Sequence, residues 1–158
     1  MLYTYHTPSP IGTLEIVSDG TFICRLTPAS TAENNAELSQ MPHVIKQCVA
    51  ELDEYFSGKL ENFTVPVFQK GTNFQQKVWS ELIKIPYAST ISYAQLAERA
   101  GHPKACRAAG SANGKNDIII IVPCHRVINS DGKLGGYAYG LEMKHILLNL
   151  EKSPHPTL

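Results

Sequence analysis

The sequence is short of three things: long apolar runs, metal-type cysteine pairs and net charge. Its longest unbroken apolar run is residues 118–122, whereas a membrane-spanning helix needs roughly 20 apolar residues. The four cysteines, at positions 24, 48, 106 and 124, include no pair at the close spacing of a zinc ribbon. The sequence therefore predicts neither a membrane protein nor a cysteine-rich zinc module.

The chain also lacks the features of a secreted protein. Its first residues show no basic segment followed by an apolar one, so we expect no signal peptide. Nothing in the cysteine spacing suggests a disulfide framework, which favours reduced thiols in the cytoplasm. A cytoplasmic protein without a bound metal or cofactor is the expectation.

The zero net charge hides a division of the chain. Fourteen Lys and Arg balance fourteen Asp and Glu. Residues 1–68 carry three of the basic and eight of the acidic side chains, a net charge of −5, so the remaining residues carry +5. Such asymmetry between two halves indicates nucleic-acid contact by the basic half. We therefore predict two domains, residues 1–68 and 69–158.

The acidic half predicts a small α/β domain. Alternation and turn residues predict strands at residues 2–6, 13–18 and 22–27, with Asp19-Gly20 as a two-residue type I′ hairpin turn. A loop is expected over the residues that follow, up to 41. An apolar stripe at helical spacing then predicts a helix from Pro42 to Gly58.

The basic half predicts four helices. Capping-box patterns at residues 72–75 and 92–95 predict the start of two helices. A break at residues 101–103 leads to a third helix, predicted over 103–114 because proline suits the first helical position. A final helix is predicted over 141–150, with an apolar face of Met143, Ile146, Leu147 and Leu150.

Two of these helices fit a helix-turn-helix, because a short glycine-containing turn joins the second to the third. The third helix has a face of small side chains that permits close approach to another surface: Ala105, Ala108, Ala109 and Ala112. Cys106 alternates with these alanines and is expected to pack in the core. Two helices that simply pack together are the alternative interpretation.

Residues 123–127 hold the densest group of reactive side chains. The Cys124 thiol becomes a good nucleophile only after losing its proton, and the adjacent His125 is a base that could take it. Neighbours on a strand point to opposite faces, so a contact needs a bend, which Pro123 favours, or a bridging water. Glu151 could orient His125. By spacing alone, however, a Cys–His pair is more often structural than catalytic.

The stretch Ile121-Val122-Pro123-Cys124-His125-Arg126-Val127 resembles the active-site motif of methylated-DNA–protein-cysteine methyltransferases, also called O6-alkylguanine-DNA alkyltransferases. The resemblance covers at least residues 72–151, and residues 9–12 resemble the family's N-terminal hairpin. Other segments in register are Ile91-Ser92-Tyr93, 104–107, 111–116, Gly136-Tyr137 and Gly140-Leu141. With this span, a catalytic Cys124 becomes the favoured interpretation.

The resemblance implies an α/β (α+β) fold, with a small ribonuclease-H-like α/β domain followed by a winged-helix-like, helix-turn-helix domain. It implies DNA repair without turnover, in which Cys124 takes the alkyl group from O6 of guanine and keeps it as a thioether. O4-methylthymine is a second candidate lesion. The expected partner is double-stranded DNA, bound by a monomer through the minor groove, with the damaged base flipped out of the stack.

The resemblance also implies roles for residues around the nucleophile. His125 would deprotonate Cys124 through a water, and Glu151 would orient His125. Tyr93 would give a proton to N3 of the leaving guanine. Arg107 would fill the gap that the flipped base leaves in the duplex.

Further roles concern the DNA-facing helix. Ala105 and Ala108 would let the helix approach the sugar-phosphate walls, and Asn113 stands where some members place an apolar side chain against the base. Asn116 would tie this helix to the active-site turn. The base pocket is expected from the carbonyls of Cys124 and Val127 together with three residues of one loop: Tyr137, Ala138 and Tyr139.

The sequence departs from the family pattern in three places. Residues 117–120 lack the prolines that often precede the active site, which removes two restraints on that loop. Tyr139 is bulky where some relatives have glycine, so we expect a tighter pocket. Cys24 and Cys48 lack the histidine-rich surroundings of a zinc site and are expected to pack.

Two other functions fit parts of the pattern. A non-catalytic lesion binder of the alkyltransferase-like type would share the DNA-binding half, but it lacks the nucleophile that Cys124 supplies. A cysteine hydrolase would use the same Cys–His–Glu triad. It would turn over many substrate molecules, whereas an alkyl acceptor stops after one.

Overall fold

The computed structural model describes residues 1–152, which divide by their internal contacts into two units, Met1–Gln69 and Lys70–Lys152. Strands and helices both occur, so the predicted mixed α/β class is confirmed. Residues 153–158, the end of the second predicted domain, lie outside the described residues. Within residues 1–152, no helix is long and apolar enough to cross a membrane.

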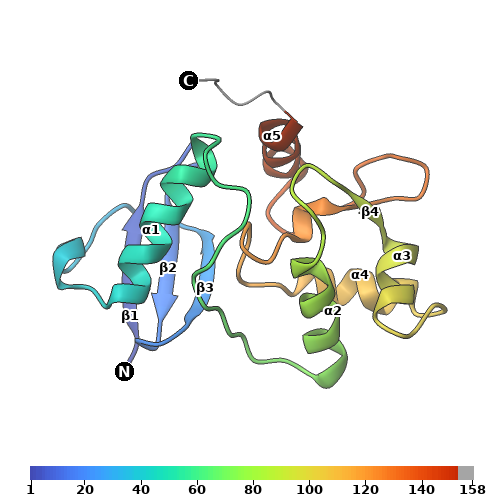
Figure 1. Ribbon diagram of the computed structural model, residues 1–158, viewed down its shortest axis with the longest axis horizontal. Coiled ribbons are helices and arrows are strands. Elements are labelled where there is room, and N and C mark those ends of the chain that lie inside the picture. The colour runs from blue at the N-terminus through green and yellow to red at the C-terminus, as the bar shows by residue number, and fades with distance from the viewer. Residues whose placement is uncertain (153–158) are drawn as a thin grey trace. The chain divides into compact units, whose positions relative to one another are not determined.

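The N-terminal unit is a three-stranded antiparallel sheet with a helix against one face (Figure 1). Its strands lie in the order in which they occur in the chain: β1 (Tyr3–Thr7), β2 (Leu14–Ser18) and β3 (Ile23–Pro28). After a short 3-10 turn, η1 (Leu38–Gln40), comes helix α1 (His43–Phe56). The predicted apolar stripe of α1 is buried against the sheet: Val44, Ile45, Cys48, Val49, Leu52 and Tyr55.

The connection between β2 and β3 differs from the predicted two-residue turn. It spans residues 19–22. Gly20 has a φ of +99°, but Asp19 is not in the left-handed region that a type I′ turn requires. The Asp19 carboxylate instead accepts hydrogen bonds from the amides of Thr21 and Phe22, at 2.9 and 2.8 Å. This side-chain turn satisfies the backbone in place of the predicted turn.

One carboxylate is buried in this unit. Glu51 of α1 is 8% exposed and accepts hydrogen bonds from the amides of Thr64 and Val65, at 2.8 and 3.1 Å. Its other oxygen accepts from the Thr64 hydroxyl and the Gln47 amide. Burial raises the pKa of Glu51, but these donors outweigh it, and the net pKa lies below the usual value. Glu51 therefore fastens the segment that leaves α1.

Three helices that pack on one another open the C-terminal unit: α2 (Asn73–Ile83), α3 (Tyr93–Arg99) and α4 (Cys106–Gly114). The predicted capping boxes at Thr72 and Ser92 are both present. Helix α4 begins later than predicted, because residues 103–105 form a turn in which the Ala105 amide donates to the His102 carbonyl at 2.8 Å. Proline therefore precedes the helix instead of opening it.

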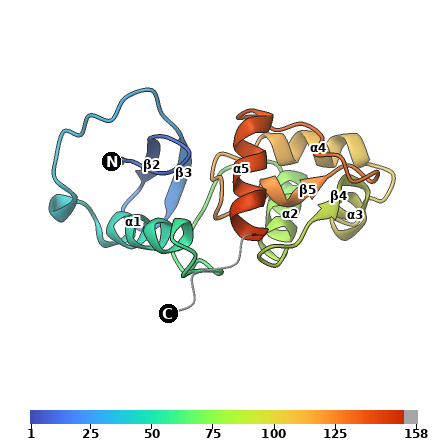
Figure 2. The same cartoon turned by 90° about the horizontal axis from the view of Figure 1, so that it is seen from above.

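The rest of this unit packs around a short 3-10 turn, η2 (Cys124–Arg126). Strand β5 (Val127–Ile128) follows η2 directly and pairs in parallel with β4 (Ile91–Ser92). Helix α5 (Leu141–Lys152) packs against η2 (Figure 2). Segments far apart in the sequence thus meet around Cys124.

The buried face of α5 differs from the predicted apolar stripe. Leu147 is fully buried, but Ile146 is 38% exposed. The interior face consists of Lys144, Leu147, Leu148 and Glu151. Two charged side chains therefore occupy positions that an apolar pattern cannot identify.

Cys106 is exposed, so its predicted place in the core is wrong. It shares a helical face with Ala109 and Asn113, which are buried. Because α4 starts at Cys106, this thiol lies at the N-terminal end of the helix, where residues 106–108 are all exposed.

Candidate active site

Residues 118–122 form a buried turn that leads to Cys124. All five side chains are buried, in keeping with the apolar run. Two amides within the run donate to carbonyls two and four residues earlier, at 2.8 and 3.1 Å, so the backbone is folded. Ile120 has a φ of +72°, which is strained for a β-branched residue. The surrounding contacts must therefore hold this turn in place.

Asn116 supplies part of that support. Its Nδ2 donates to the carbonyls of Val122 and Ile118, at 2.8 and 3.2 Å, and its Oδ1 accepts from the Ile118 amide at 3.0 Å. Its own carbonyl accepts from the Tyr139 hydroxyl at 3.3 Å. Asn116 thus connects the end of α4, the turn before Cys124 and the loop before α5.

The three residues of η2 are all buried, and Cys124 is 3% exposed. Because they lie in a 3-10 turn, their side chains do not alternate between two faces as on a strand. Among the described contacts of Cys124, none is a hydrogen bond to the His125 ring, whereas Sγ lies 3.8 Å from the Tyr137 hydroxyl. Burial raises the pKa of the Cys124 thiol, and polar neighbours, among them Asn116 and Tyr137, act in the opposite direction.

Glu151 joins α5 to η2. Its Oε2 lies 2.6 Å from His125 Nε2. The Arg126 guanidinium donates through Nε to Oε1 at 2.8 Å and through Nη2 to Oε2 at 3.0 Å. The Ala88 amide adds a donor at 3.3 Å, from a residue whose own φ is +62°. Because the fork of an arginine matches a carboxylate, Glu151 is fixed in orientation toward His125.

These contacts set the protonation states of His125 and Glu151. Burial raises the pKa of a carboxyl, but the donors from His125 and Arg126 outweigh it and lower the pKa of Glu151 to about 2. Burial lowers the pKa of His125, against the attraction of Glu151, so the imidazole is neutral at pH 7. With Nε2 as the protonated nitrogen, Nδ1 is an acceptor, and it has no partner among the described residues. A neutral base of this kind suits thiol deprotonation.

A pocket of about 240 Å³ opens beside Cys124. Its other walls come from α3, α4 and the loop before α5: Tyr93, Gly110, Asn113, Gly114, Gly136, Tyr137, Ala138 and Tyr139. The Tyr137 and Tyr139 rings pack edge to face, 5.8 Å apart. Val127 lies in β5 and is not among the residues that line the pocket; the expected role of its carbonyl toward a bound base stays a prediction.

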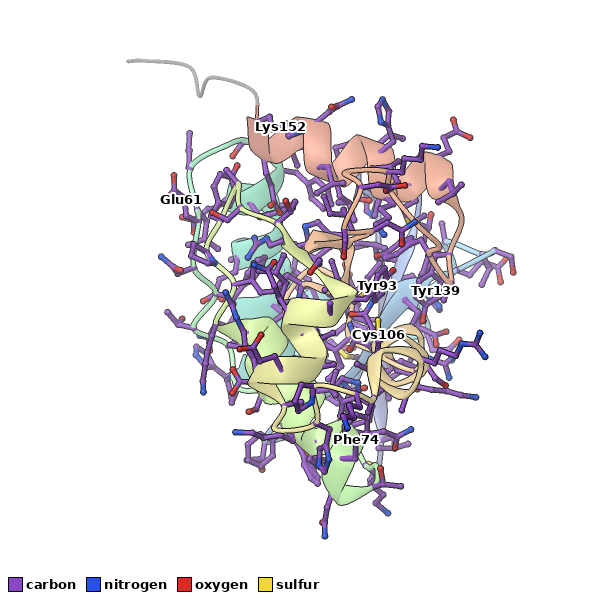
Figure 3. All side chains as sticks on the ribbon, turned by 90° about the vertical axis from the view of Figure 1, so that its right-hand side faces the viewer. Glu61, Phe74, Tyr93, Cys106, Tyr139 and Lys152 are labelled. Atoms are coloured by element: carbon purple, nitrogen blue, oxygen red, sulfur yellow. The ribbon has the colours of Figure 1, made fainter. Side chains whose placement is uncertain are left out.

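Two polar side chains of α3 and α4 line this pocket. Tyr93, labelled in Figure 3, begins α3. Its hydroxyl donates to the Gly136 carbonyl at 3.3 Å. Burial and the nearby Cys124 raise the pKa of Tyr93, so the phenol keeps its proton at neutral pH. Asn113 is 5% exposed, and its Nδ2 donates to the Cys124 carbonyl at 3.3 Å.

The outer face of α4 has the residues predicted to meet DNA. Arg107 and Ala108 are exposed, and Ala105 is half-buried just before the helix. Helices α3 and α4 pack against each other across the intervening turn, as a helix-turn-helix requires. Of the two cysteines of the N-terminal unit, Cys48 is buried and Cys24 is half-buried.

Sequence reasoning missed two buried cations. Arg126 is 5% exposed and, besides its contacts with Glu151, donates to the Ile85 carbonyl at 2.8 Å. Lys144 is fully buried, and its Nζ donates to the carbonyls of Leu134 and Gly136. Spacing could have found Lys144, because a residue seven positions before Glu151 lies on the same helical face.

A buried cysteine backed by a His–Glu pair, on a unit with a helix-turn-helix arrangement, defines a protein that uses a thiol nucleophile beside a nucleic-acid-binding surface. Residues 73–153 match the family model described as 6-O-methylguanine DNA methyltransferase, DNA binding domain. Residues 1–68 match the model for the ribonuclease-like domain of the same methyltransferase. The chain belongs to the 6-O-methylguanine DNA methyltransferase family.

Individual relatives agree over nearly the full length. The chain is 42% identical over 158 residues to the methylated-DNA–protein-cysteine methyltransferase of Mycobacterium tuberculosis, covering 99% of this chain and 96% of that one. It is 41% identical over 160 residues to the constitutive enzyme of Bacillus subtilis, covering 96% of both.

Solved structures give the same picture. The crystal structure of Mycobacterium tuberculosis O6-methylguanine methyltransferase has a TM-score of 0.86 at 42% identity, covering 99% of this chain and 96% of that chain. Mycobacterium tuberculosis OGT in complex with DNA has a TM-score of 0.84 at 41% identity, covering 94% and 92%.

Proposed function

We propose that this protein repairs DNA by moving the alkyl group from O6 of guanine to its own Cys124 in a single irreversible turnover. The observation that carries the proposal is the buried Cys124 thiol at the wall of a pocket, next to the His125–Glu151 pair. Membership of the family supports it. O4-methylthymine is a second candidate lesion for the same pocket.

The proposed reaction exchanges one alkyl group for one proton. The thiol proton passes to His125 Nδ1 through a water, and Sγ of Cys124 attacks the alkyl carbon. The S–C bond forms as the C–O6 bond breaks, and the electron pair of the broken bond stays on the guanine. The Tyr93 hydroxyl protonates N3 of the base, and solvent later reprotonates Tyr93 and takes the proton from His125.

Glu151 orients the His125 imidazole and stabilises its protonated form. The carboxylate holds His125 Nε2 at 2.6 Å, which leaves Nδ1 for the thiol proton. Arg126 holds Glu151 in turn, so the carboxylate stays ionised and fixed. Because a thioether has no hydrolysable bond, the protein has no route back to the thiol.

DNA is the partner that the exposed face of α4 fits. A base inside a duplex cannot reach a buried thiol, so the lesion must be flipped out. We place Ala105 and Ala108 against the minor-groove walls, with the exposed Arg107 in the gap left by the base. The net charge of +5 on residues 69–158 predicts weak, salt-dependent binding. That the protein is a monomer and lies in the cytoplasm stays a prediction.

Two rival functions differ in what remains on the protein. A lesion binder without chemistry leaves Cys124 unmodified, and a cysteine hydrolase releases product and turns over repeatedly. Alkyl transfer leaves one stable group on each molecule and then stops. Counting modified molecules therefore separates the three.

The test is intact-mass spectrometry after incubation with a duplex that contains one O6-methylguanine. We expect one added methyl group per protein, located on Cys124 by peptide mapping, and no further product with excess DNA. No added mass, or several turnovers on an ester or peptide, would contradict the proposal.

A pair of variants gives the matched control. Cys124 and Cys48 are both buried thiols, one in each unit. Cys124→Ala should abolish the mass gain while keeping binding to the methylated duplex. Cys48→Ala should gain the methyl group as the wild type does.

A further inference from the structure

Lys144 is a buried cation without an anionic partner. Its side chain is fully buried, and no carboxylate of residues 1–152 lies within ion-pair distance of it. The other buried charges of this unit, Glu81, Arg126 and Glu151, all have partners of opposite charge. Burial without a partner disfavours a cation and lowers the pKa of Lys144 to about 8. The group is still protonated at pH 7, so the unit contains an uncompensated positive charge.

The neighbours of this charge belong to the proposed reaction. Nζ donates to the Gly136 carbonyl at 2.9 Å, and the Tyr93 hydroxyl donates to the same oxygen at 3.3 Å. Nζ also lies 5.8 Å from the centroid of the Tyr93 ring. The charges of Lys144 and Cys124 act on each other favourably. The cation thus lies beside the proposed proton donor and interacts electrostatically with the nucleophile.

We propose that Lys144 is a positioning residue for the alkyl transfer: it fixes the Gly136 carbonyl that holds the Tyr93 hydroxyl, and its charge favours the Cys124 thiolate and the Tyr93 phenolate. This inference rests on the proposed function. Lys144 makes and breaks no covalent bond and keeps its own protons. Its charge acts at two moments, before the S–C bond forms and after Tyr93 gives up its proton.

The other ionisable groups around Lys144 are already engaged. Helix α3 contributes Tyr93, and η2 contributes Cys124 and His125, whose pKa Lys144 helps to lower. On α5 itself, Glu151 is occupied by His125 and Arg126. The anions that form during the reaction are therefore the ones left for Lys144 to stabilise.

Two neutral variants separate charge from hydrogen bonding. Lys144→Gln keeps a donor for the carbonyls, Lys144→Met keeps only the apolar stem, and Lys152→Gln removes an exposed charge from the same helix as a control. Alkylation of Cys124 by iodoacetamide is followed against pH, with Cys124→Ala as the blank for the other thiols. Methyl transfer from a methylated duplex is then measured in single turnover.

We expect both Lys144 variants to shift the pH profile of Cys124 upward by roughly one unit, and to slow methyl transfer at pH 7 at least tenfold. Lys152→Gln should match the wild type in both assays. A Lys144→Gln protein with the wild-type profile and rate would overturn the role of the charge, leaving only a structural lysine. An unchanged profile in both folded variants would overturn it as well.

A second test keeps the lysine at position 144. The ¹⁵N signal of Lys144 Nζ should follow its own titration in both proteins, with a lower midpoint in Cys124→Ala than in the wild type, because the thiolate raises the pKa of Lys144. A signal that ignores the thiol would refute the coupling. These readouts do not need DNA, so a wild type that gains no methyl group would remove the proposed function without deciding whether Lys144 and Cys124 are coupled.

Discussion

Each unit has a buried glutamate on a helix that holds a segment distant in the sequence: Glu51 in the first and Glu151 in the second. Glu51 accepts from two backbone amides, a hydroxyl and a side-chain amide, all of which are uncharged. Glu151 accepts from a guanidinium and contacts an imidazole. Glu51 thus contacts only uncharged hydrogen-bond donors, whereas Glu151 contacts the imidazole of His125, which can act as a base.

The contrast separates buried polarity that supports a fold from buried polarity that performs chemistry. Both carboxylates have a lowered pKa, so a perturbed pKa alone does not distinguish them. What distinguishes Glu151 is that its partner His125 has an acceptor nitrogen with no partner among residues 1–152, next in the chain to a buried thiol. A site is better recognised by an unfilled hydrogen-bonding position than by the size of an electrostatic shift.

The largest expected difference lies between the two glutamates. Glu151→Gln should reduce the single-turnover rate of methyl transfer by about 10²–10⁴-fold, the range typical for losing general-base catalysis. It should also cost about 3–5 kcal/mol of unfolding free energy, because Arg126 is left buried without its anion. Radiolabelled methyl transfer and urea unfolding measure the two effects.

Glu51→Gln is the matched control for this change. It should cost about 1–3 kcal/mol of unfolding free energy, because one carboxylate oxygen that accepts from Thr64 and Gln47 is replaced by a donor. The rate per folded molecule should stay at the wild-type value. Equal rates in the two variants would remove the distinction between the two carboxylates.

A smaller difference is expected between two exposed arginines, Arg107 on α4 and Arg25 on β3. Arg107→Ala should slow repair of a methylated duplex about tenfold, or ~1.4 kcal/mol, because the flipped-out state would lose the side chain that we propose replaces the base. Repair of free O6-methylguanine base should not change. Arg25→Ala should leave both rates alone, and an equal loss on duplex and free base would exclude a role of Arg107 in flipping.

The last expected difference concerns stability in acid. The pKa of Glu151 falls from 4.5 to about 2 on folding, so its contribution is complete above about pH 4.5 and is lost as the pH falls toward 2. His125 acts in the same direction, because its pKa is lowered in the folded state and protonation therefore favours unfolding. Urea midpoints between pH 7 and 3 should show Glu151→Gln losing about 2 kcal/mol less than the wild type. Parallel curves would contradict this.

Local chemistry accounts for what the sequence could predict. Thr72 and Ser92 mark their helices because each hydroxyl satisfies an amide only three residues away, and the stripe of α1 follows from burial against one sheet. The strand positions follow from alternation in the same way. These features depend on residues close together in the chain, so a single sequence is enough to predict them.

The parts that could not be predicted depend on distant contacts. The buried face of α5 includes Lys144 and Glu151 because carbonyls and side chains from other segments receive them. Ile120 adopts a left-handed conformation within a turn that Asn116 holds on both sides, at Ile118 and Val122. The juxtaposition of His125 and Glu151 was expected from the family resemblance, since the spacing of residues 125 and 151 by itself was weak.

Asn116 helps to set the width of the pocket. Its side chain holds the Val122 carbonyl, two residues before Cys124, and its own carbonyl holds the Tyr139 hydroxyl in the pocket lining. The positions of Cys124 and of Tyr139 are therefore both set by Asn116, through a few covalent and hydrogen bonds. Small shifts of the surrounding helices displace both together, so the width available to an adduct is conserved while the rest of the unit adjusts.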